Sequence, residues 1–589
     1  MHPLDYFIVF IYLVITLLIG LIPAWQKRNS VETLDEFHLG DFPWWALGAS
    51  GMASNVDIAG TMVIAALVYS LGTRGFFIEI RGGIVLIMAF LMVFMGKWTR
   101  RSQVMTTAEW MRFRFGEGKE GNLARIISAI SNIVFSIGAM SYFSIGGGKF
   151  IGYLMGISDR LASILLVILA AVYTVASGFS GVIWTDVFQA LLILVAVVYI
   201  CGLAWTKVDL PESFTVSLPN GKDFILKEWN FADWSTLLPP LKMDIPGDYA
   251  IFNLFGGVIL FYLLKTAIEG CSGTGGYIAQ RYFAARSELD TGLLSLFWIV
   301  SMAFRWPLIT GFAVLGIHYS LTQNAPIPDA ELILPIVITN YVPMGLRGLM
   351  VACFMAAAMS TFSSIINASA AYWTKDIYQA YLAPQASEAN LVFQSRLASV
   401  LIVVVGLLFS FNLSNINDIW GWLSLGLGVG LAIPLLLRWY WWRFNGYGFA
   451  WGTLAGMVTA IATKILINNS QNQEYILFFV PGICALLGCL IGTYTTPETP
   501  SDVVKHFYAV TQPFGFWGKY SKGITSEHKR DILATFVAVP WQLSLFLLGV
   551  MVIMKNWENV KILALALWLL SIALYFTWFR HLKSQERGK

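Results

Sequence analysis

Three small residues at helical spacing have the chemistry of a cation site. Ala357, Ser360 and Thr361 stand at positions i, i+3 and i+4 of an apolar segment, so they share one face if the segment is a helix. Two hydroxyls and a backbone carbonyl on that face could replace part of the hydration shell of a hard cation such as sodium, which prefers oxygen ligands. The alternative is that small hydroxyl residues only allow helices to pack closely in a membrane.

A second feature is the presence of polar residues inside two long apolar segments, 43–71 and 248–285. Asp57 lies between glycines in the first segment, and Lys265 and Glu269, which are expected to neutralise each other, precede the string GCSGTGG in the second. A charged side chain at the bilayer centre costs roughly 2.5 to 3.5 kcal/mol, so each must face a cavity or a partner. Broken helices at corresponding positions of two halves indicate a transporter with a site near the membrane midplane.

The composition places the chain in a membrane. Hydrophobic residues make up 57% of the 589 positions and charged residues 12%, which is typical of an all-α polytopic protein surrounded by a lipid bilayer. The net charge of +4 gives no reason to expect a nucleic-acid partner, and no obligatory protein partner is evident. The sequence contains no clustered nucleophile, base or metal set, so we do not expect an enzyme.

Apolar stretches of about 20 residues predict about 15 transmembrane helices. They lie near residues 5–25, 43–71, 76–97, 124–155, 160–178, 181–206, 248–285, 291–318, 346–382, 391–411, 415–440, 446–468, 475–497, 531–554 and 560–579. Basic residues gather in 97–125 and 498–530, which the positive-inside rule assigns to the cytoplasm. The expected arrangement is therefore a plasma (inner) membrane protein with its N-terminus outside and its C-terminal tail, 580–589, in the cytoplasm.

The predicted spans divide the chain into five parts. They are a leading helix and loop (1–42), a first repeat (43–207), an outer loop (208–247), a second repeat (248–440) and peripheral trailing helices (441–589). Each repeat begins with a broken helix and holds about five helices. An odd number of helices per repeat inverts the second half across the membrane relative to the first.

Four separated strings resemble one family of transporters. TTAEWMRFRFG (106–116), SGVIWTDVFQ (180–189), GGYIAQRYFAARS (275–287) and MSTFSSIINASAAYWTKDIY (359–378) are similar, in order and spacing, to the sodium:solute symporters. The resemblance covers roughly residues 1–440. It implies a leucine-transporter-like inverted-repeat core of ten helices, with one leading and about four trailing helices, and solute transport driven by Na+.

The resemblance also implies the ligands of the main sodium site. In the family this site uses backbone carbonyls of the first broken helix together with hydroxyls of the helix that carries the MSTFSS string. The corresponding residues of this chain are Ala53, Val56, Ala357, Ser360 and Thr361. We therefore expect the first break to lie against the middle of the later helix.

Asp186 is a candidate for a second cation site. An acidic residue inside the apolar string WTDVFQALLILVAVV requires a partner. In some relatives this position joins hydroxyls one step beyond the main site to hold a further sodium ion, or it receives a proton. Ser363 and Ser364 are the matching hydroxyls here. The alternative is that Asp186 forms a gate by hydrogen bonding to neighbouring helices.

The solute site is expected at the two breaks, around Asn55 and Asp57 in the first. Asn55 matches an asparagine that contacts sugar in the sugar-carrying relatives, and counting back from AEW places Arg81 where they carry a glutamate. The positions of their aromatic and polar sugar contacts hold Cys271, Ser272, Gly275 and Gly276. The aromatic platform of those relatives is therefore not expected at the second break.

The presence of Arg81 favours an anionic solute, because a planar guanidinium binds carboxylates well. The predicted function is import of a small polar organic molecule with Na+, such as a sugar acid or another carboxylate. If Arg81 instead pairs with Asp57 or Glu79, a neutral sugar or an amino acid is the alternative. A membrane sensor built like a transporter is the alternative of another class, and the sequence shows no output module for it.

Overall fold

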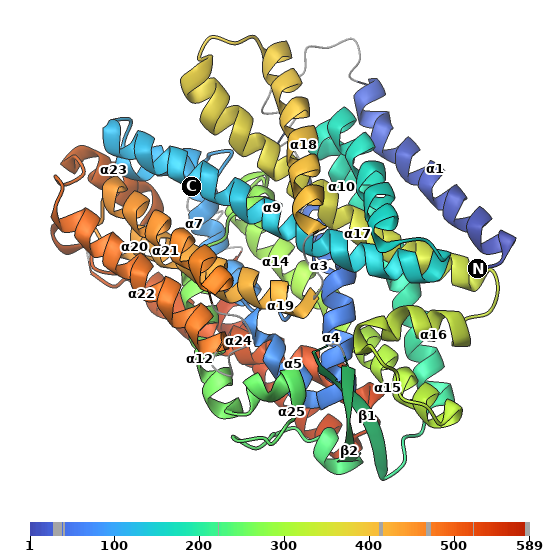
Figure 1. Ribbon diagram of the computed structural model, residues 1–589. Helices are drawn as coiled ribbons and strands as arrows, with labels where there is room; N and C mark the ends of the chain where they lie inside the picture. Colours follow the sequence, from blue (N-terminus) through green and yellow to red (C-terminus); the bar gives the residue numbers. More distant parts are fainter. Residues whose placement is uncertain are drawn as a thin grey trace.

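The computed structural model describes residues 1–26, 38, 42–221, 223–411, 416–466, 473–521 and 523–582. These residues form a bundle of long helices with one small β-hairpin at its edge (Figure 1). The helices before the hairpin are α1 (Pro3–Gln26), α3 (Trp44–Asn55), α4 (Ile58–Leu71), α5 (Thr73–Ile78), α6 (Ile87–Phe90), α7 (Gly96–Arg101), α8 (Glu109–Phe115), α9 (Lys119–Met155) and α10 (Asp159–Lys207).

The second part of the chain begins at the hairpin, whose strands are β1 (Ser213–Asn220) and β2 (Asp223–Asn230). The helices that follow are α11 (Phe231–Trp234), α12 (Phe255–Ser272), α13 (Gly276–Phe283), α14 (Glu288–Met302), α15 (Arg305–Gln323), α16 (Ile333–Tyr341), α17 (Leu346–Ala371), α18 (Glu388–Ser410), α19 (Ile416–Gly421), α20 (Gly428–Tyr440), α21 (Gly446–Leu466), α22 (Gln473–Tyr494), α23 (Ser501–Thr511), α24 (Ser526–Ile553), α25 (Trp557–Leu574) and α26 (Arg580–Leu582).

The chain is a multi-pass membrane protein. Within the described residues, 12 helices are long and apolar enough to cross a bilayer, and the bent pair α3–α4 makes a possible total of 13. The sequence predicted about 15. The difference lies at 76–97, which is broken into the short pieces α5, η1 (Glu79–Arg81), α6, η2 (Leu91–Met95) and α7, and at 160–178, which is the first arm of α10. Most of the predicted C-terminal tail, 583–589, lies outside the described residues.

The first predicted break separates α3 from α4, and the two helices are bent by 59° relative to each other. Val56 leaves the helical region at φ −83° and ψ 60°, and Asp57 is extended. Asp57 then caps α4, because its carboxylate accepts a hydrogen bond from the backbone N–H of Gly60. A short polar side chain that bonds to its own backbone thus ends one helix and starts the next.

The second predicted break separates α12 from α13 and depends on glycine. Gly273 has φ +76° and Gly276 has φ +56°, values in the left-handed region that residues with a Cβ rarely adopt. The glycine string therefore lets the chain leave α12 at Ser272 and re-enter a helix at Gly276. Both breaks fall where the sequence predicted them.

Helix α17 is the central element of the bundle and is buried along almost its whole length (Figure 1). It packs against α10, α1, α9, α3 and α13. Helix α10 bends at Gly178, where φ is +59°, and its second arm lies against α17. This packing brings the two broken helices close to α10, the helix that carries Asp186.

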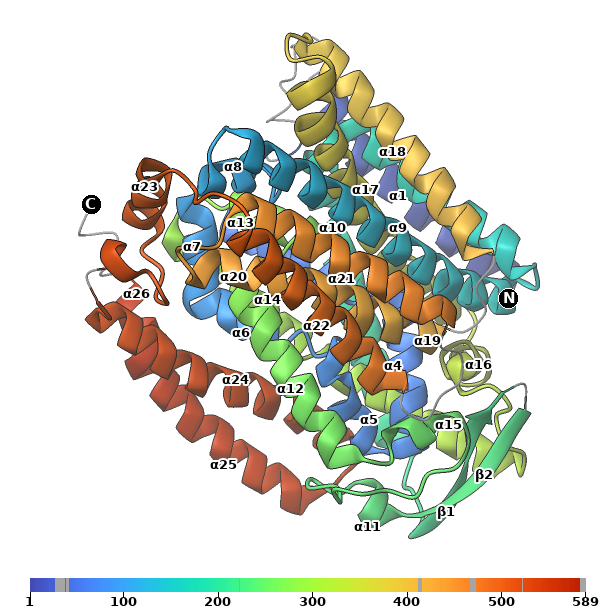
Figure 2. The ribbon, with the colours of Figure 1, turned by 60° about the vertical axis from the view of Figure 1, so that its left-hand side comes forward.

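The trailing helices lie in two groups (Figure 2). Helices α21 and α22 pack on α20, whereas α24 and α25 pack on each other, and α24 also contacts α15 and α6. Gln542 of α24 donates hydrogen bonds to the carbonyls of Ile84 and Val85, at 3.3 and 3.2 Å. Helix α24 thus supports the backbone between η1 and α6, while the peripheral position of the trailing helices relative to the transport path stays a prediction.

The hairpin covers one end of α4 (Figure 2). Its strands are antiparallel, with Ser213 opposite Asn230. Trp229 on β2 donates from Nε1 to the carbonyl of Ser70 at 2.9 Å, and the Ser70 hydroxyl donates to the carbonyl of Ser217 at 3.2 Å. These bonds satisfy backbone groups at the end of α4, so the hairpin and the broken helix are joined.

Candidate functional site

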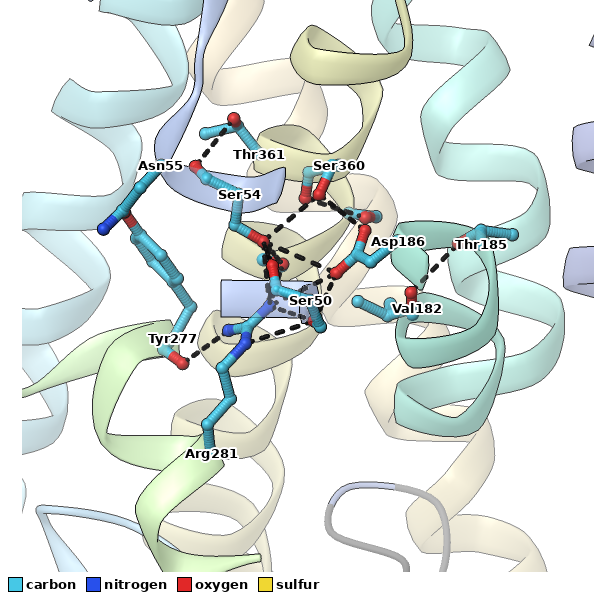
Figure 3. Close-up of polar contacts among 12 residues, drawn as sticks. Ser50, Ser54, Asn55, Val182, Thr185, Asp186, Tyr277, Arg281, Ser360 and Thr361 are labelled. Carbon is cyan, nitrogen blue, oxygen red and sulfur yellow. Dashed lines mark hydrogen bonds and ion pairs between the residues drawn. The ribbon is translucent and has the colours of Figure 1, made fainter. Parts of the chain in front are cut away.

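The main sodium site predicted from the sequence lies where α3 ends against α17 (Figure 3). The Thr361 hydroxyl donates to the carbonyl of Ser54 at 2.9 Å and to that of Ala357 at 3.0 Å. The Ser360 hydroxyl lies 3.2 Å from that of Ser54. The structure thus brings together the five predicted ligand residues, which are all buried: Ala53, Val56, Ala357, Ser360 and Thr361.

The break between α3 and α4 supplies backbone oxygen atoms to the predicted sodium site. The backbone N–H of Val56 still donates to Met52, and the next helical bond runs from Thr61 to Asp57. Carbonyl groups between these two bonds lack a helical donor, as at any helix end. Uncharged carbonyl and hydroxyl oxygens in a dry setting are suited to a hard cation. The chemistry of the donor set therefore fits Na+ as the co-transported ion.

Asp186 on α10 is the centre of a buried polar cluster (Figure 3). Its Oδ1 accepts a hydrogen bond from Ser360 at 2.6 Å, and its Oδ2 accepts one from Ser50 of α3 at 2.5 Å. Arg281 of α13 completes the cluster, with Nη2 at 3.3 Å from the same Oδ2. Asp186 consequently links four helices, α3, α10, α13 and α17.

Arg281 occupies the place predicted for a second cation. Its Nη2 donates to the hydroxyls of Ser54 and Ser364 at 2.8 and 2.9 Å. Ser363, the other predicted ligand, instead donates to the carbonyl of Ser360 at 3.0 Å. Of the two roles that the sequence left open for Asp186, this geometry favours the hydrogen-bonded gate. A further sodium ion would have to displace the guanidinium from the cluster.

A cavity of about 280 Å³ lies between the two breaks. Its walls come from α4, η1, α9, α12, α13, α15 and α19–α20. Five of the residues predicted to contact the solute line it, namely Asn55, Asp57, Ser272, Gly275 and Gly276. Cys271 and Arg81, the other two, are not among the lining residues of the described chain. The cavity thus lies at the two breaks that the sequence predicted.

Aromatic side chains reach the cavity from several helices, including the second broken helix. Tyr142 of α9 stacks on Trp420 of α19, with ring centroids 5.2 Å apart and planes at 24°. Tyr277 of α13 donates to the side-chain carbonyl of Asn55 at 2.7 Å. The aromatic rings of Tyr142, Tyr277 and Trp420 therefore line the cavity, although Cys271 and Ser272 carry none.

Arg81 is fully buried in an ion pair. Its Nη2 donates to Glu79 Oε1 at 3.0 Å and to Asn417 Oδ1 at 2.6 Å, and its Nη1 lies 3.5 Å from Glu474 Oε1. The structure corrects the expectation that Arg81 faces the solute and favours the alternative, a pair with Glu79. Glu79 itself lines the cavity, so an acidic side chain is present two positions before the expected charge reversal.

The other charged residues of the cavity are also paired. Lys265 lies 2.7 Å from Glu269, which confirms the mutual neutralisation predicted from the sequence. Asp57 lies 3.3 Å from Arg305, a residue that the sequence analysis did not connect with it. Buried charges are costly unless paired, so these contacts are expected. Each charged side chain that lines the cavity therefore has a partner inside the protein.

Sequence reasoning missed two residues that matter here, Arg281 and Trp420. Arg281 stands in the string GGYIAQR that was used for the resemblance, and its charge in an apolar environment could have identified it as a partner for Asp186. Ser50 and Ser54, at helical spacing in α3, were a similar signal. Trp420 carries no comparable signal, because its place at the cavity depends only on how α19 packs.

Two helices broken near the middle of a membrane bundle, a cation-suited oxygen cluster and an adjoining cavity define a secondary transporter. Residues 39–456 match the model of the sodium:solute symporter family, and the chain belongs to this family. The resemblance read from the four sequence strings is thereby confirmed. The chain is accordingly a member of a family of sodium-coupled solute transporters.

Similar proteins include carriers of sugars and polyols. The mouse sodium/glucose cotransporter 4 is 27% identical over 500 residues, which cover 79% of this chain and 69% of that protein. The sodium/glucose cotransporter of Vibrio parahaemolyticus is 26% identical over 433 residues, covering 69% and 74%. The human sodium/myo-inositol cotransporter 2 is 26% identical over 428 residues, covering 69% of this chain and 61% of that protein.

A solved structure shows the same fold. The Na+-coupled sialic acid symporter in its substrate-bound outward-open state superposes with a TM-score of 0.63 at 20% identity. The alignment covers 85% of this chain and 99% of the symporter. The predicted fold class, a leucine-transporter-like inverted repeat with additional helices, is confirmed.

Proposed function

We propose that this chain imports a small, neutral, polyhydroxylated solute together with Na+, by alternating access. The observation that carries the solute assignment is the pairing of every charged side chain that lines the cavity. Arg81, the one residue that favoured a carboxylate, contacts Glu79 and Glu474 and not the cavity. An anionic solute would therefore meet no unpaired cation there.

The lining of the cavity matches the chemistry of a sugar or polyol. Trp420 and Tyr142 present aromatic surface on which the apolar face of a ring can lie, and Asn55 and Glu79 supply polar atoms. A few placed polar groups on an otherwise apolar wall are typical of small-molecule sites. The relatives named above, which carry glucose or myo-inositol by their names, support the same class of solute.

We assign the co-transported Na+ to Ala53, Val56, Ala357, Ser360 and Thr361. Asn55 lies in the same break as two of these residues and lines the cavity. An ion that holds the end of α3 against α17 would therefore also fix the position of Asn55. The ion then shifts the population toward the solute-binding state, which makes the two binding events cooperative.

Tyr277 connects the second broken helix to this coupling between sodium binding and solute binding. Its hydroxyl bonds to Asn55, and Arg281 one turn later on α13 bonds to Ser54 at the end of α3. The two broken helices are thus connected on both sides of the sodium region. We further propose a location in the plasma (inner) membrane, with the N-terminus outside and the C-terminus in the cytoplasm.

The test is uptake into proteoliposomes of purified protein, with and without an inward sodium gradient. The probes are radiolabelled D-glucose, myo-inositol and D-glucuronate. We expect sodium-dependent uptake of at least one neutral probe and little uptake of glucuronate. Sodium-dependent uptake of glucuronate alone would overturn the neutral-solute assignment. Uptake that is identical in potassium and sodium would overturn the sodium coupling.

A further inference from the structure

Glu474, on α22, lies behind the wall of the solute cavity, where it contacts Arg81, and it lies beyond the family-matched segment 39–456. Its side chain is only 6% exposed. Oε1 lies 3.5 Å from Arg81 Nη1, and Oε2 accepts a hydrogen bond from the Tyr262 hydroxyl at 2.6 Å. Both oxygens accept, which is the bonding pattern of an ionised carboxylate.

Glu474 and Arg81 meet beside Gly421, a glycine of the helix that lies between them. A Cβ on Gly421, at the end of α19, would lie 3.3 Å from Glu474 Oε1 and 3.6 Å from Arg81 Nη1. The small residue at this position leaves room for the two charged groups to meet. Helix α22 is therefore connected to η1 across α19 through buried side chains.

The connection continues to the cavity surface. Arg81 donates from Nε and Nη2 to Glu79 Oε1, at 3.2 and 3.0 Å. The other oxygen of Glu79 accepts from Trp420 Nε1 at 3.2 Å. Glu79 and Trp420 both line the cavity. Removing the charge of Glu474 would therefore affect the solute through the contacts of Arg81, Glu79 and the Trp420 indole.

The charges at this wall do not balance. Asp57 and Arg305 pair, as do Lys265 and Glu269, so both pairs are neutral. Arg81 by contrast is shared between two carboxylates, Glu79 and Glu474. Asp418 of α19, another acidic residue near Glu474, is paired with Lys464. One negative charge is therefore in excess, and it exists because of Glu474.

We propose that Glu474 is a positioning residue that sets the charge selectivity of the cavity: it holds Arg81 away from the solute and keeps the wall net negative, which excludes carboxylates. This inference rests on the proposed function, because it concerns the same site. It gives a helix outside the family-matched segment a part in substrate choice. Without the Glu474 charge, Arg81 and Glu79 would form a neutral pair and the repulsion of an anion would fall.

The experiment compares uptake of D-glucuronate and D-glucose by the parent and by Glu474→Gln. We expect the glucuronate-to-glucose ratio to rise about tenfold, which is the Coulomb effect of one charge at roughly 12 Å for an effective dielectric constant of about 20. The double variant Glu474→Gln with Arg81→Gln restores the excess negative charge and should return the ratio toward that of the parent. Glu498→Gln is the matched control, since Glu498 is 55% exposed and pairs with Arg443 at the far end of α22.

The readouts separate selectivity from stability. Thermal unfolding in detergent checks that each variant is folded, and Glu474→Asp, which keeps the charge, should keep the parental ratio. An unchanged ratio in folded Glu474→Gln would overturn the inference, as would a ratio that rises equally in Glu498→Gln. A parent that takes up only glucuronate would overturn the proposed neutral solute, but the change in ratio would still decide the part played by Glu474.

Discussion

Removing the Thr361 hydroxyl should weaken sodium coupling without disturbing the fold. This hydroxyl sits where the end of α3 meets α17, 2.9 Å from the carbonyl of Ser54 and 3.0 Å from that of Ala357. Thr361→Val keeps the shape of the side chain and removes only the oxygen. Thr361→Ser keeps the oxygen and removes a methyl group, so the two variants separate ligation from packing.

The size of the effect follows from the loss of one oxygen from a buried charged ligand set. A hydrogen bond to a charged group is worth about 1.5 to 3 kcal/mol, and we take a sodium–hydroxyl contact to be of similar size. Every 1.4 kcal/mol is tenfold in affinity, so the sodium concentration for half-maximal uptake should rise roughly 10- to 150-fold in Thr361→Val. Thr361→Ser should stay within about threefold of the parent.

The assay is initial uptake of the transported solute as a function of sodium concentration at constant ionic strength. Ser369→Ala is the matched control, because Ser369 is also fully buried on α17 but its hydroxyl bonds only to its own helix, at Ile365, 2.7 Å away. Parental sodium curves in Thr361→Val would remove this residue from the sodium site. An equal rise in Ser369→Ala would show that the effect comes from general damage to α17.

Three further predictions concern the charged pairs and the topology. Asp186→Asn should slow transport while leaving the charge moved per solute unchanged, because Arg281 already fills the cluster; a lower charge-to-flux ratio would show that Asp186 holds a cation. Asp57→Asn should lower the free energy of unfolding by about 3 to 5 kcal/mol, because it leaves Arg305 buried without its partner. Adding Arg305→Gln should restore much of this loss, and losses that simply add in the double variant would contradict the pairing. A reporter fused to the C-terminus should be active in the cytoplasm, and an external signal would show that a span was miscounted.

The sequence alone predicted the features that depend on local chemistry. The string around Asp57 interrupts a helix because a short carboxylate caps the next one, and the string from Gly273 to Gly276 does so because glycine alone adopts the required backbone angles. The shared face of Ala357, Ser360 and Thr361 followed from helical spacing. Two predicted helices differ from the structure: 76–97 is a series of short pieces, and 160–178 is the first arm of α10. The pair Gly82–Gly83 was a signal for the break inside 76–97 that the count of apolar residues did not use.

The roles of the charged residues could not be determined in this way. Arg81 contacts two acidic residues, Glu79 and Glu474, and it does not line the cavity. Only the fold shows these two facts. Arg281 lies 95 positions from Asp186 in the chain, yet its guanidinium fills the oxygen cluster assigned to a cation. A charged residue in an apolar segment indicates that a partner exists, but the sequence does not identify that partner.

The sequence by itself therefore determined the class of the protein, from four separated strings. It also determined the two breaks and the helix face that we propose for sodium, because these depend on residues within one or two turns of each other. The tertiary structure decided which charges cancel, which aromatic rings line the cavity and that Glu474 of α22 pairs with Arg81 behind its wall. Several of those properties depend on distances between residues hundreds of positions apart, such as Arg81 and Glu474 or Asp57 and Arg305. Such distances are fixed by the packing of whole helices and by no local pattern.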